Sequence, residues 1–237
     1  MELYDMHSHI LPQMDDGAED VEVSKKILNV LYSQGVSHIC LTPHYYSHKE
    51  SMEDFLKRRE YCFSLLKPHI PQGIEVCLGA EVYVTDIIMN NTSLNPVCYG
   101  SSNYILLEFP YQTTFKDSSF ELLVRLMNRY GVKPILAHIE RYPALLGNPK
   151  LMQELSSYGI RFQTNAVSYL DRGTFRKLKK LIKLGLVDFI GSDAHNLVRN
   201  SPQKFGEAVE LINKKTSPNV VRAITHFSRD VFEDAVK

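Results

Sequence analysis

The sequence predicts an α/β fold in which parallel strands alternate with helices and curl into a barrel. Short apolar runs alternate with amphipathic helical stretches about seven times along the chain. Polar side chains that can bind metal follow nearly every run. An open doubly wound sheet would concentrate such residues at one switch point, whereas a closed or nearly closed barrel collects them from all its strand ends. We therefore expect one barrel domain over residues 1–237.

The expected strands are short runs of aliphatic and aromatic residues bounded by turn-forming residues. Most of the segments between them are long enough to form a helix, which is the usual connection between parallel strands. The runs cover residues 3–6, 36–41, 74–78, 104–107, 134–137, 160–162 and 187–190.

Helices are predicted from apolar spacing and from signals at their ends. An apolar stripe at residues 23, 27, 28 and 31 is followed by Gly35, and a second at residues 175, 178, 181 and 182 is followed by Gly185. A capping box predicts a helix start at Ser118, with Glu121 as its partner. Pairs of a polar residue and proline predict three further starts, at Asn148-Pro149, Ser201-Pro202 and Ser217-Pro218.

Composition excludes several classes of function. Lys plus Arg and Asp plus Glu number 27 each, so no net charge favours binding to nucleic acid or to an anionic membrane. No segment approaches the roughly 20 apolar residues of a membrane span. The N-terminus lacks the charged, apolar and small-residue parts of a signal peptide. We expect a cytoplasmic protein without membrane insertion.

The four cysteines, Cys40, Cys62, Cys77 and Cys98, show no CxxC spacing, which argues against a disulfide framework or a thiolate zinc site. Cys40 and Cys77 fall in expected strands, where a small core residue is the simplest role. A cysteine-based phosphatase would need a phosphate loop that closes on an arginine. The sixth residue after each cysteine is tyrosine or proline, so this chain has no such loop.

The polar residues at the strand ends form a candidate metal centre. His7 and His9 lie two apart at the end of the first strand, so their side chains point the same way. Mixed imidazole and carboxylate ligands suit Mn, Fe or Zn better than Mg or Ca. One ion takes four to six ligands, so this set predicts two or three ions with a bridging carboxylate. The set is His7, His9, Asp16, His44, Glu81, Glu108, His138, Asp193 and His195.

Clustered divalent ions favour hydrolysis of an anionic ester, with a metal-bound hydroxide as the nucleophile. Arg141, three residues after His138, is placed to hold a phosphate in bidentate fashion, although it could instead form a salt bridge with Glu140 or another neighbour. Arg199, four residues after His195, is a second candidate for phosphate binding.

These motifs resemble the PHP (polymerase and histidinol phosphatase) superfamily. Within it, the chain is similar to the bacterial protein-tyrosine phosphatases of capsule and exopolysaccharide operons. The match extends in the family's order over nearly the whole chain. It consists of His7-Ser8-His9-Ile10-Leu11-Pro12, Asp15-Asp16-Gly17, Thr42-Pro43-His44, Gly79-Ala80-Glu81, Glu108-Phe109-Pro110, His138 with Glu140-Arg141, and Ser192-Asp193-Ala194-His195-Asn196.

The resemblance implies a distorted seven-stranded β/α barrel with three ions, usually manganese. It would place His7, His9, Glu81 and Asp193 on one ion, Glu108 and His138 with a bridging Glu81 on a second, and Asp16, His44 and His195 on the third. Arg141 would bind phosphate. The chain departs from the family pattern at Ile139, where proline is common, and at Arg199, which lies about one residue closer to His195.

The function that the resemblance implies is hydrolysis of phosphotyrosine on a membrane-associated bacterial tyrosine kinase and its targets. Two alternatives stay open: a small-molecule phosphatase such as histidinol-phosphatase, and a non-catalytic metal-binding module. The module is disfavoured because it would normally have lost ligands. An aromatic leaving group is supported by tyrosines near the expected strand ends, which could stack on it: Tyr45, Tyr46, Tyr83, Tyr111 and Tyr142.

Overall fold

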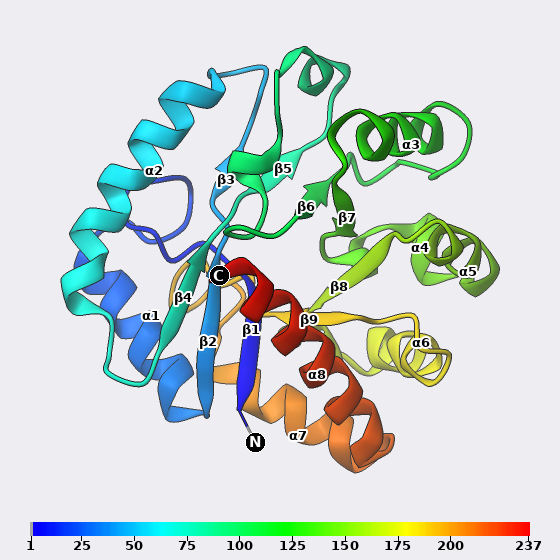
Figure 1. Ribbon diagram of the computed structural model, residues 1–237. Coiled ribbons are helices and arrows are strands. Elements are labelled where there is room, and N and C mark those ends of the chain that lie inside the picture. Colours follow the sequence, from blue (N-terminus) through cyan, green and yellow to red (C-terminus); the bar gives the residue numbers. More distant parts are fainter. Residues whose placement is uncertain (1) are drawn as a thin grey trace.

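The computed structural model describes residues 2–237, which form a curled sheet of parallel strands surrounded by helices (Figure 1). Neighbouring strands pair in the orders β1-β2-β4 and β3-β5-β6-β7-β8-β9. The strands are β1 (Leu3–Ser8), β2 (Val36–Leu41), β3 (His44–Tyr45), β4 (Glu75–Leu78), β5 (Glu81–Tyr83), β6 (Tyr104–Glu108), β7 (Lys133–Leu136), β8 (Arg161–Asn165) and β9 (Phe189–Gly191).

Two of the barrel strands are each broken into two pieces. Residues 42–43 separate β2 from β3, and residues 79–80 separate β4 from β5. Pro43 has no N–H to donate, which interrupts regular pairing. Its carbonyl still accepts a hydrogen bond of 3.0 Å from the Glu81 N–H, so the two broken strands stay side by side. Each pair of pieces fills one strand position, so the nine strands found in residues 2–237 fill seven positions.

The first and last strands meet and close the sheet. The His9 N–H donates to the Ala194 carbonyl at 3.1 Å, and the Asp193 N–H donates to the His7 carbonyl at 2.7 Å. Both bonds join the carboxyl end of β1 to the residues just after β9. The prediction of a distorted seven-stranded β/α barrel is therefore confirmed.

Helices cover the outside of the sheet between successive strands (Figure 1). The connection from β5 to β6 is an exception, because it carries only the short 3-10 helices η2 (Asp86–Asn90) and η3 (Asn95–Val97). The α-helices are α1 (Val21–Ser33), α2 (Met52–Leu66), α3 (Ser118–Tyr130), α4 (Pro143–Leu146), α5 (Pro149–Ser157), α6 (Arg172–Lys183), α7 (Phe205–Lys215) and α8 (Pro218–Ala235).

Three of the predicted helices begin at the predicted position, and the fourth begins with a 3-10 turn. The Asn148 and Ser217 side chains accept hydrogen bonds from backbone N–H groups in the first turns of α5 and α8. Ser118 is the first residue of α3 rather than its cap, because Asp117 precedes it in a positive-φ conformation that makes no side-chain cap bond. Ser201 leads into a 3-10 turn, and α7 begins only at Phe205.

Helix α8 closes the amino-terminal end of the barrel. In Figure 1 it lies across the strands, and the C-terminus is near the centre of the view. Its Phe227 ring packs on Phe189 and Tyr104, the first residues of β9 and β6, with centroid distances of 5.1 and 6.2 Å. Cys40 and Cys77 are buried beside it among apolar side chains, so their prediction as core residues is confirmed. The opposite end of the barrel is left for the polar residues.

Candidate metal centre

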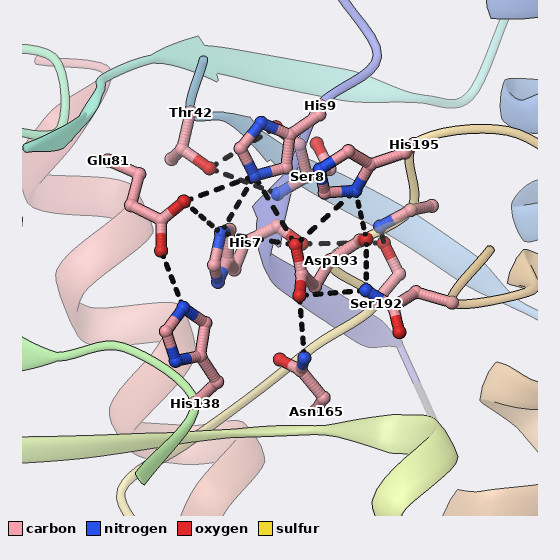
Figure 2. A network of polar contacts seen from close by, with 12 residues as sticks. His7, Ser8, His9, Thr42, Glu81, His138, Asn165, Ser192, Asp193 and His195 are labelled. Carbon is pink, nitrogen blue, oxygen red and sulfur yellow. Dashed lines mark hydrogen bonds and ion pairs between the residues drawn. The ribbon is translucent and has the colours of Figure 1, made fainter. Parts of the chain in front are cut away.

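All nine predicted ligands lie at the carboxyl ends of the strands, where the barrel brings them together. His7 belongs to β1 and Glu81 to β5, whereas His138 follows β7. Figure 2 shows imidazoles and carboxylates from these separate elements pointing toward one another. Seven of the nine are buried; the His44 side chain is 12% exposed and that of Asp16 is 54% exposed. The cluster therefore has a buried interior and one side that faces solvent.

The centre of the cluster is formed by His7, His9, Glu81 and Asp193. The two Nε2 atoms lie 3.1 Å apart, and each is 3.3 Å from Glu81 Oε2. Asp193 Oδ1 lies 3.3 Å from His9 Nε2 and 3.6 Å from His7 Nε2. Atoms at these separations surround a point at which one cation could contact all four side chains.

Glu81 also reaches a second group of candidate ligands. Its Oε1 atom lies 2.8 Å from His138 Nε2, which is 3.5 Å from Glu108 Oε1. Its Oε2 atom lies 3.0 Å from His44 Nδ1, which in turn is 3.9 Å from Glu108 Oε2. Glu81 is thus the carboxylate that touches both groups, as a bridging ligand would.

A third group lies on the solvent side. Asp16 Oδ1 is 3.5 Å from both His44 Nε2 and His195 Nε2, and a ring nitrogen of His9 belongs to the same group. His44 stands between the second and third groups, with one ring nitrogen toward each.

The hydrogen bonds of three imidazoles leave their inner nitrogens free to bind a cation. His7 Nδ1 faces Gln163 Oε1 at 3.2 Å, His9 Nδ1 faces Asp15 Oδ2 at 2.8 Å, and His195 Nδ1 faces the Asp193 carbonyl at 2.8 Å. Each partner oxygen can only accept, so each Nδ1 carries a hydrogen and Nε2 is the ring atom that can bind a cation. Burial lowers the pKa of His7 and His9, but the carboxylates of Glu81, Asp193 and Asp15 raise it overall, so the space between the two Nε2 atoms, 3.1 Å apart, favours a positive charge. Histidine ligands oriented in this way are typical of metal sites, so the residues fit bound metal.

Two candidate ligands sit on strained backbone. His138 has φ of 32° and Asp193 has φ of 51°, in the left-handed region that residues with a Cβ rarely adopt. Each such residue costs about 1–3 kcal/mol and persists only where its surroundings hold it. Here the His138 N–H donates to Gln163 Oε1 at 2.6 Å, and the Asp193 carboxylate accepts from Asn165 Nδ2 at 2.7 Å. Strain of this kind concentrates at functional sites.

The electrostatics of the cluster favour a cation. Burial would raise the pKa of Glu81, yet His7 and the other imidazoles around it hold that pKa well below its usual range. Burial likewise opposes ionisation of Asp193, and His7 and His9 still lower its pKa. Burial lowers the pKa of His195 to about 4, helped by the charge of His9, so this imidazole is neutral at pH 7. The site therefore combines ionised carboxylates with a neutral imidazole, the forms that bind metal.

The two predicted phosphate-binding arginines both lie at the solvent side of the cluster. Arg141 Nη2 donates to Asp193 Oδ2 at 2.6 Å, and its side chain remains 29% exposed. Arg199 Nη1 donates to Asp16 Oδ2 at 2.5 Å, and its side chain is 51% exposed. Arg141 does not pair with Glu140, whose carboxylate accepts instead from the Asn165 N–H and the Ser168 hydroxyl.

Sequence reasoning missed the residues that orient the candidate ligands. Asp15 accepts hydrogen bonds from His9 and from the His44 N–H, and Gln163 contacts both His7 and His138. Asn165 holds Asp193 from β8. A signal was present: Gln163 and Asn165 follow directly after a predicted strand, as several candidate ligands do, and Asp15 adjoins Asp16.

A family model for capsular polysaccharide synthesis proteins, CpsB/CapC, matches residues 3–230. The chain belongs to this family. Relatives include the tyrosine-protein phosphatase CpsB of Streptococcus agalactiae, 32% identical over 224 residues, with 89% of each chain covered. CpsB of Streptococcus pneumoniae is 32% identical over 228 residues and 90% of each chain. The tyrosine-protein phosphatase YwqE of Bacillus subtilis is 30% identical over 82% of this chain and 78% of its own. The prediction of a capsule-type phosphatase family is confirmed.

Solved structures show the same fold for this CpsB/CapC protein. A chain from the crystal structures of YwqE from Bacillus subtilis and CpsB from Streptococcus pneumoniae, described as metal-dependent tyrosine phosphatases, matches with a TM-score of 0.81. It has 24% sequence identity and covers 98% of this chain and 95% of its own. A phosphotriesterase homology protein from Escherichia coli shares the barrel more distantly, with a TM-score of 0.59 at 13% identity. Among the described residues of the CpsB/CapC protein, no helix has the length and apolar character needed to cross a membrane.

Proposed function

We propose that this CpsB/CapC protein is a metal-dependent phosphatase that removes phosphate from tyrosine in proteins. The support from relatives is the name tyrosine-protein phosphatase, carried by chains that it matches over most of their length. The support from the structure is one observation: ring nitrogens of several imidazoles and the oxygens of Glu81 converge at the solvent-facing end of the barrel. We further propose two to three divalent ions, manganese foremost, held by the nine candidate ligands.

When bound, the ions would neutralise charge on the phosphoryl oxygens and lower the pKa of a water for attack on phosphorus. The chain's own groups position the substrate. Arg141 reaches the rim with a planar guanidinium that matches the geometry of phosphate oxygens, and Arg199 supplies a second, more exposed positive charge. The four cysteines are buried, so none is placed to form a covalent phosphoenzyme.

The expected substrate is a phosphotyrosine protein, foremost a bacterial tyrosine kinase and its targets, in the cytoplasm. This partner is inferred from the family's connection with capsule synthesis and from the substrate class in the relatives' names. A small-molecule phosphatase with the same metal chemistry is the alternative that the first experiment must separate.

The test compares initial rates on a phosphotyrosine peptide and on histidinol phosphate, with manganese added and after chelation. We expect the peptide to be hydrolysed with the higher kcat/KM, and activity to be lost on chelation and restored by manganese. His7→Ala should lower both metal content and activity, because removing one ligand leaves a poorly compensated site. His226→Ala is the matched control, since His226 is 74% exposed on α8. Full activity in the metal-free protein would contradict the proposal.

A further inference from the structure

A hollow lined by aromatic side chains adjoins the candidate metal centre. Its volume is about 300 Å³, within the range of small-ligand sites. Tyr46, Tyr83, Phe109 and Tyr111 line it, and Glu108 forms the wall shared with the cluster. The hollow opens to solvent through Tyr111, which is 44% exposed.

Two candidate ligands connect the hollow to the place where phosphate would bind. Glu108 lies 3.5 Å from His138 Nε2, and the Tyr46 ring lies 5.2 Å from the ring of His44. The Tyr111 hydroxyl is 3.4 Å from both Glu108 Oε1 and Arg141 Nη1, so it links the hollow to the arginine as well. A phosphate held between Arg141 and this side of the cluster would therefore have its ester group over the hollow.

The structure divides the five tyrosines near the strand ends into two kinds. Tyr45 is buried against Phe55, and Tyr142 is buried with its hydroxyl hydrogen-bonded to the Phe109 backbone, so neither can meet a substrate. Tyr46, Tyr83 and Tyr111 remain at the hollow.

The remaining tyrosines are arranged to accept another aromatic ring. The Tyr46 and Tyr83 rings are tilted by 46° with centroids 5.7 Å apart, which leaves a concave aromatic surface rather than a closed stack. Lys49 Nζ lies 4.1 Å from the Tyr46 ring centroid, and Arg141 Nη1 lies 3.4 Å from the Tyr111 hydroxyl, so two of these tyrosines each have a cationic side chain beside them. A phenyl ring in the hollow would gain aromatic contacts that the alkyl group of phosphoserine cannot make.

We propose that this hollow binds the ring of the phosphorylated tyrosine and makes the enzyme select aryl over alkyl phosphate monoesters. The inference rests on the proposed function and adds to it the residues that choose the substrate: Tyr46 and Tyr83, with Tyr111 at the entrance. These residues contact the leaving group, whereas the cluster and Arg141 contact the phosphate.

The test is the double variant Tyr46→Leu/Tyr83→Leu, which removes both rings but keeps apolar bulk. The control is Tyr61→Leu, because Tyr61 is 62% exposed on α2. For each protein kcat/KM is measured with manganese on a phosphotyrosine peptide and on the same peptide carrying phosphoserine. Each rate is divided by the wild-type rate on the same substrate, which cancels the different reactivity of phenol and alkyl esters. We expect an aryl-specific loss of about 5- to 100-fold, from two lost aromatic contacts, and an alkyl change within about twofold.

A proportionate loss on both peptides would overturn the inference, since it would mean that the tyrosines only support the fold or the metal centre. Tyr83→Leu alone provides a second variant, because the Tyr83 ring packs on Tyr46 and His48, and it should show an aryl-specific loss in the same direction. Wild-type enzyme that hydrolyses neither peptide with manganese would instead overturn the proposed function itself. Variants with unchanged rates on both substrates would leave that function standing and refute the aromatic site.

Discussion

Asp15 offers the sharpest test of how this centre is built, because it touches a candidate ligand without belonging to the predicted set. Its carboxylate accepts three hydrogen bonds: at Oδ2 from His9 Nδ1 (2.8 Å) and the His44 N–H (2.9 Å), and at Oδ1 from the Gly17 N–H (2.9 Å). Burial opposes its ionisation, yet His9 lowers its pKa below the usual range. Both oxygens therefore act only as acceptors.

The substitution Asp15→Asn keeps the shape but not this pattern. An amide has one acceptor oxygen, so its NH₂ must face at least one N–H, and a buried donor loses its partner at a cost of about 1–3 kcal/mol. The His9 ring also loses the negative charge that supports its basicity. Removing such a supporting carboxylate typically weakens metal binding by about 10- to 100-fold. We expect the Kd for manganese to rise by that factor, and kcat/KM to recover to within a few-fold when manganese is saturating.

The assay is a manganese titration followed both by calorimetry and by initial rate. Asp171→Asn is the control, because Asp171 caps α6 from an exposed position and asparagine caps helices equally well. If Asp15→Asn bound manganese with the wild-type Kd, the argument that this carboxylate orients His9 for metal binding would be refuted.

Three further predictions follow from other contacts. Arg141→Ala should lower kcat/KM by about 30- to 1000-fold with metal content unchanged, and Arg141→Lys should recover part of this; near-normal kcat/KM in the alanine variant would refute phosphate binding by Arg141. Replacing all four cysteines by Ala or Ser should leave substantial phosphatase activity in folded protein, and a trapped phosphocysteine would contradict this. Burial raises the pKa of Asp188 from 3.8 to about 6, so ionising it costs the folded state about 3 kcal/mol, and stability is lost as pH rises from about 4 to about 6. Asp188→Asn should therefore gain stability relative to wild type over this range in urea unfolding, whereas a pH-independent difference would show that the carboxyl is not perturbed.

The sequence was sufficient to predict the barrel and the residues that gather at its mouth, for one physical reason. In a parallel barrel all carboxyl strand ends lie at the same end, so a ligand-type residue after each apolar run is enough to place it. His138 and Asp193, 55 positions apart, needed no long-range information beyond this rule. The same rule applied to Gln163 and Asn165, but amides are ordinary residues at strand ends and did not stand out.

Details that depend on local backbone conformation could not be predicted from the sequence. The helix starts at Ser118 as predicted, but Ser118 does not cap it, since the N-cap position is held by Asp117 with φ of 49° and no side-chain cap bond. The break at Thr42-Pro43 could not be recognised as part of a single strand position, because the hydrogen bond that bridges it comes from Glu81, far along the chain. At the break, a tertiary contact decided the local structure.

The supporting hydrogen bonds explain why predicting the ligands is not the same as predicting the site. Gln163 Oε1 accepts from the His138 N–H at 2.6 Å and also faces His7 Nδ1 at 3.2 Å, so one amide holds a strained backbone and sets the tautomer of another ligand. Its Nε2 atom donates to Asn165 Oδ1, and Asn165 in turn holds Asp193. Three ligands from β1 and from the loops after β7 and β9 are thus oriented by two residues of β8. This coupling exists only once the barrel has closed, because the partners are brought together by the curvature of the sheet and not by any spacing in the chain.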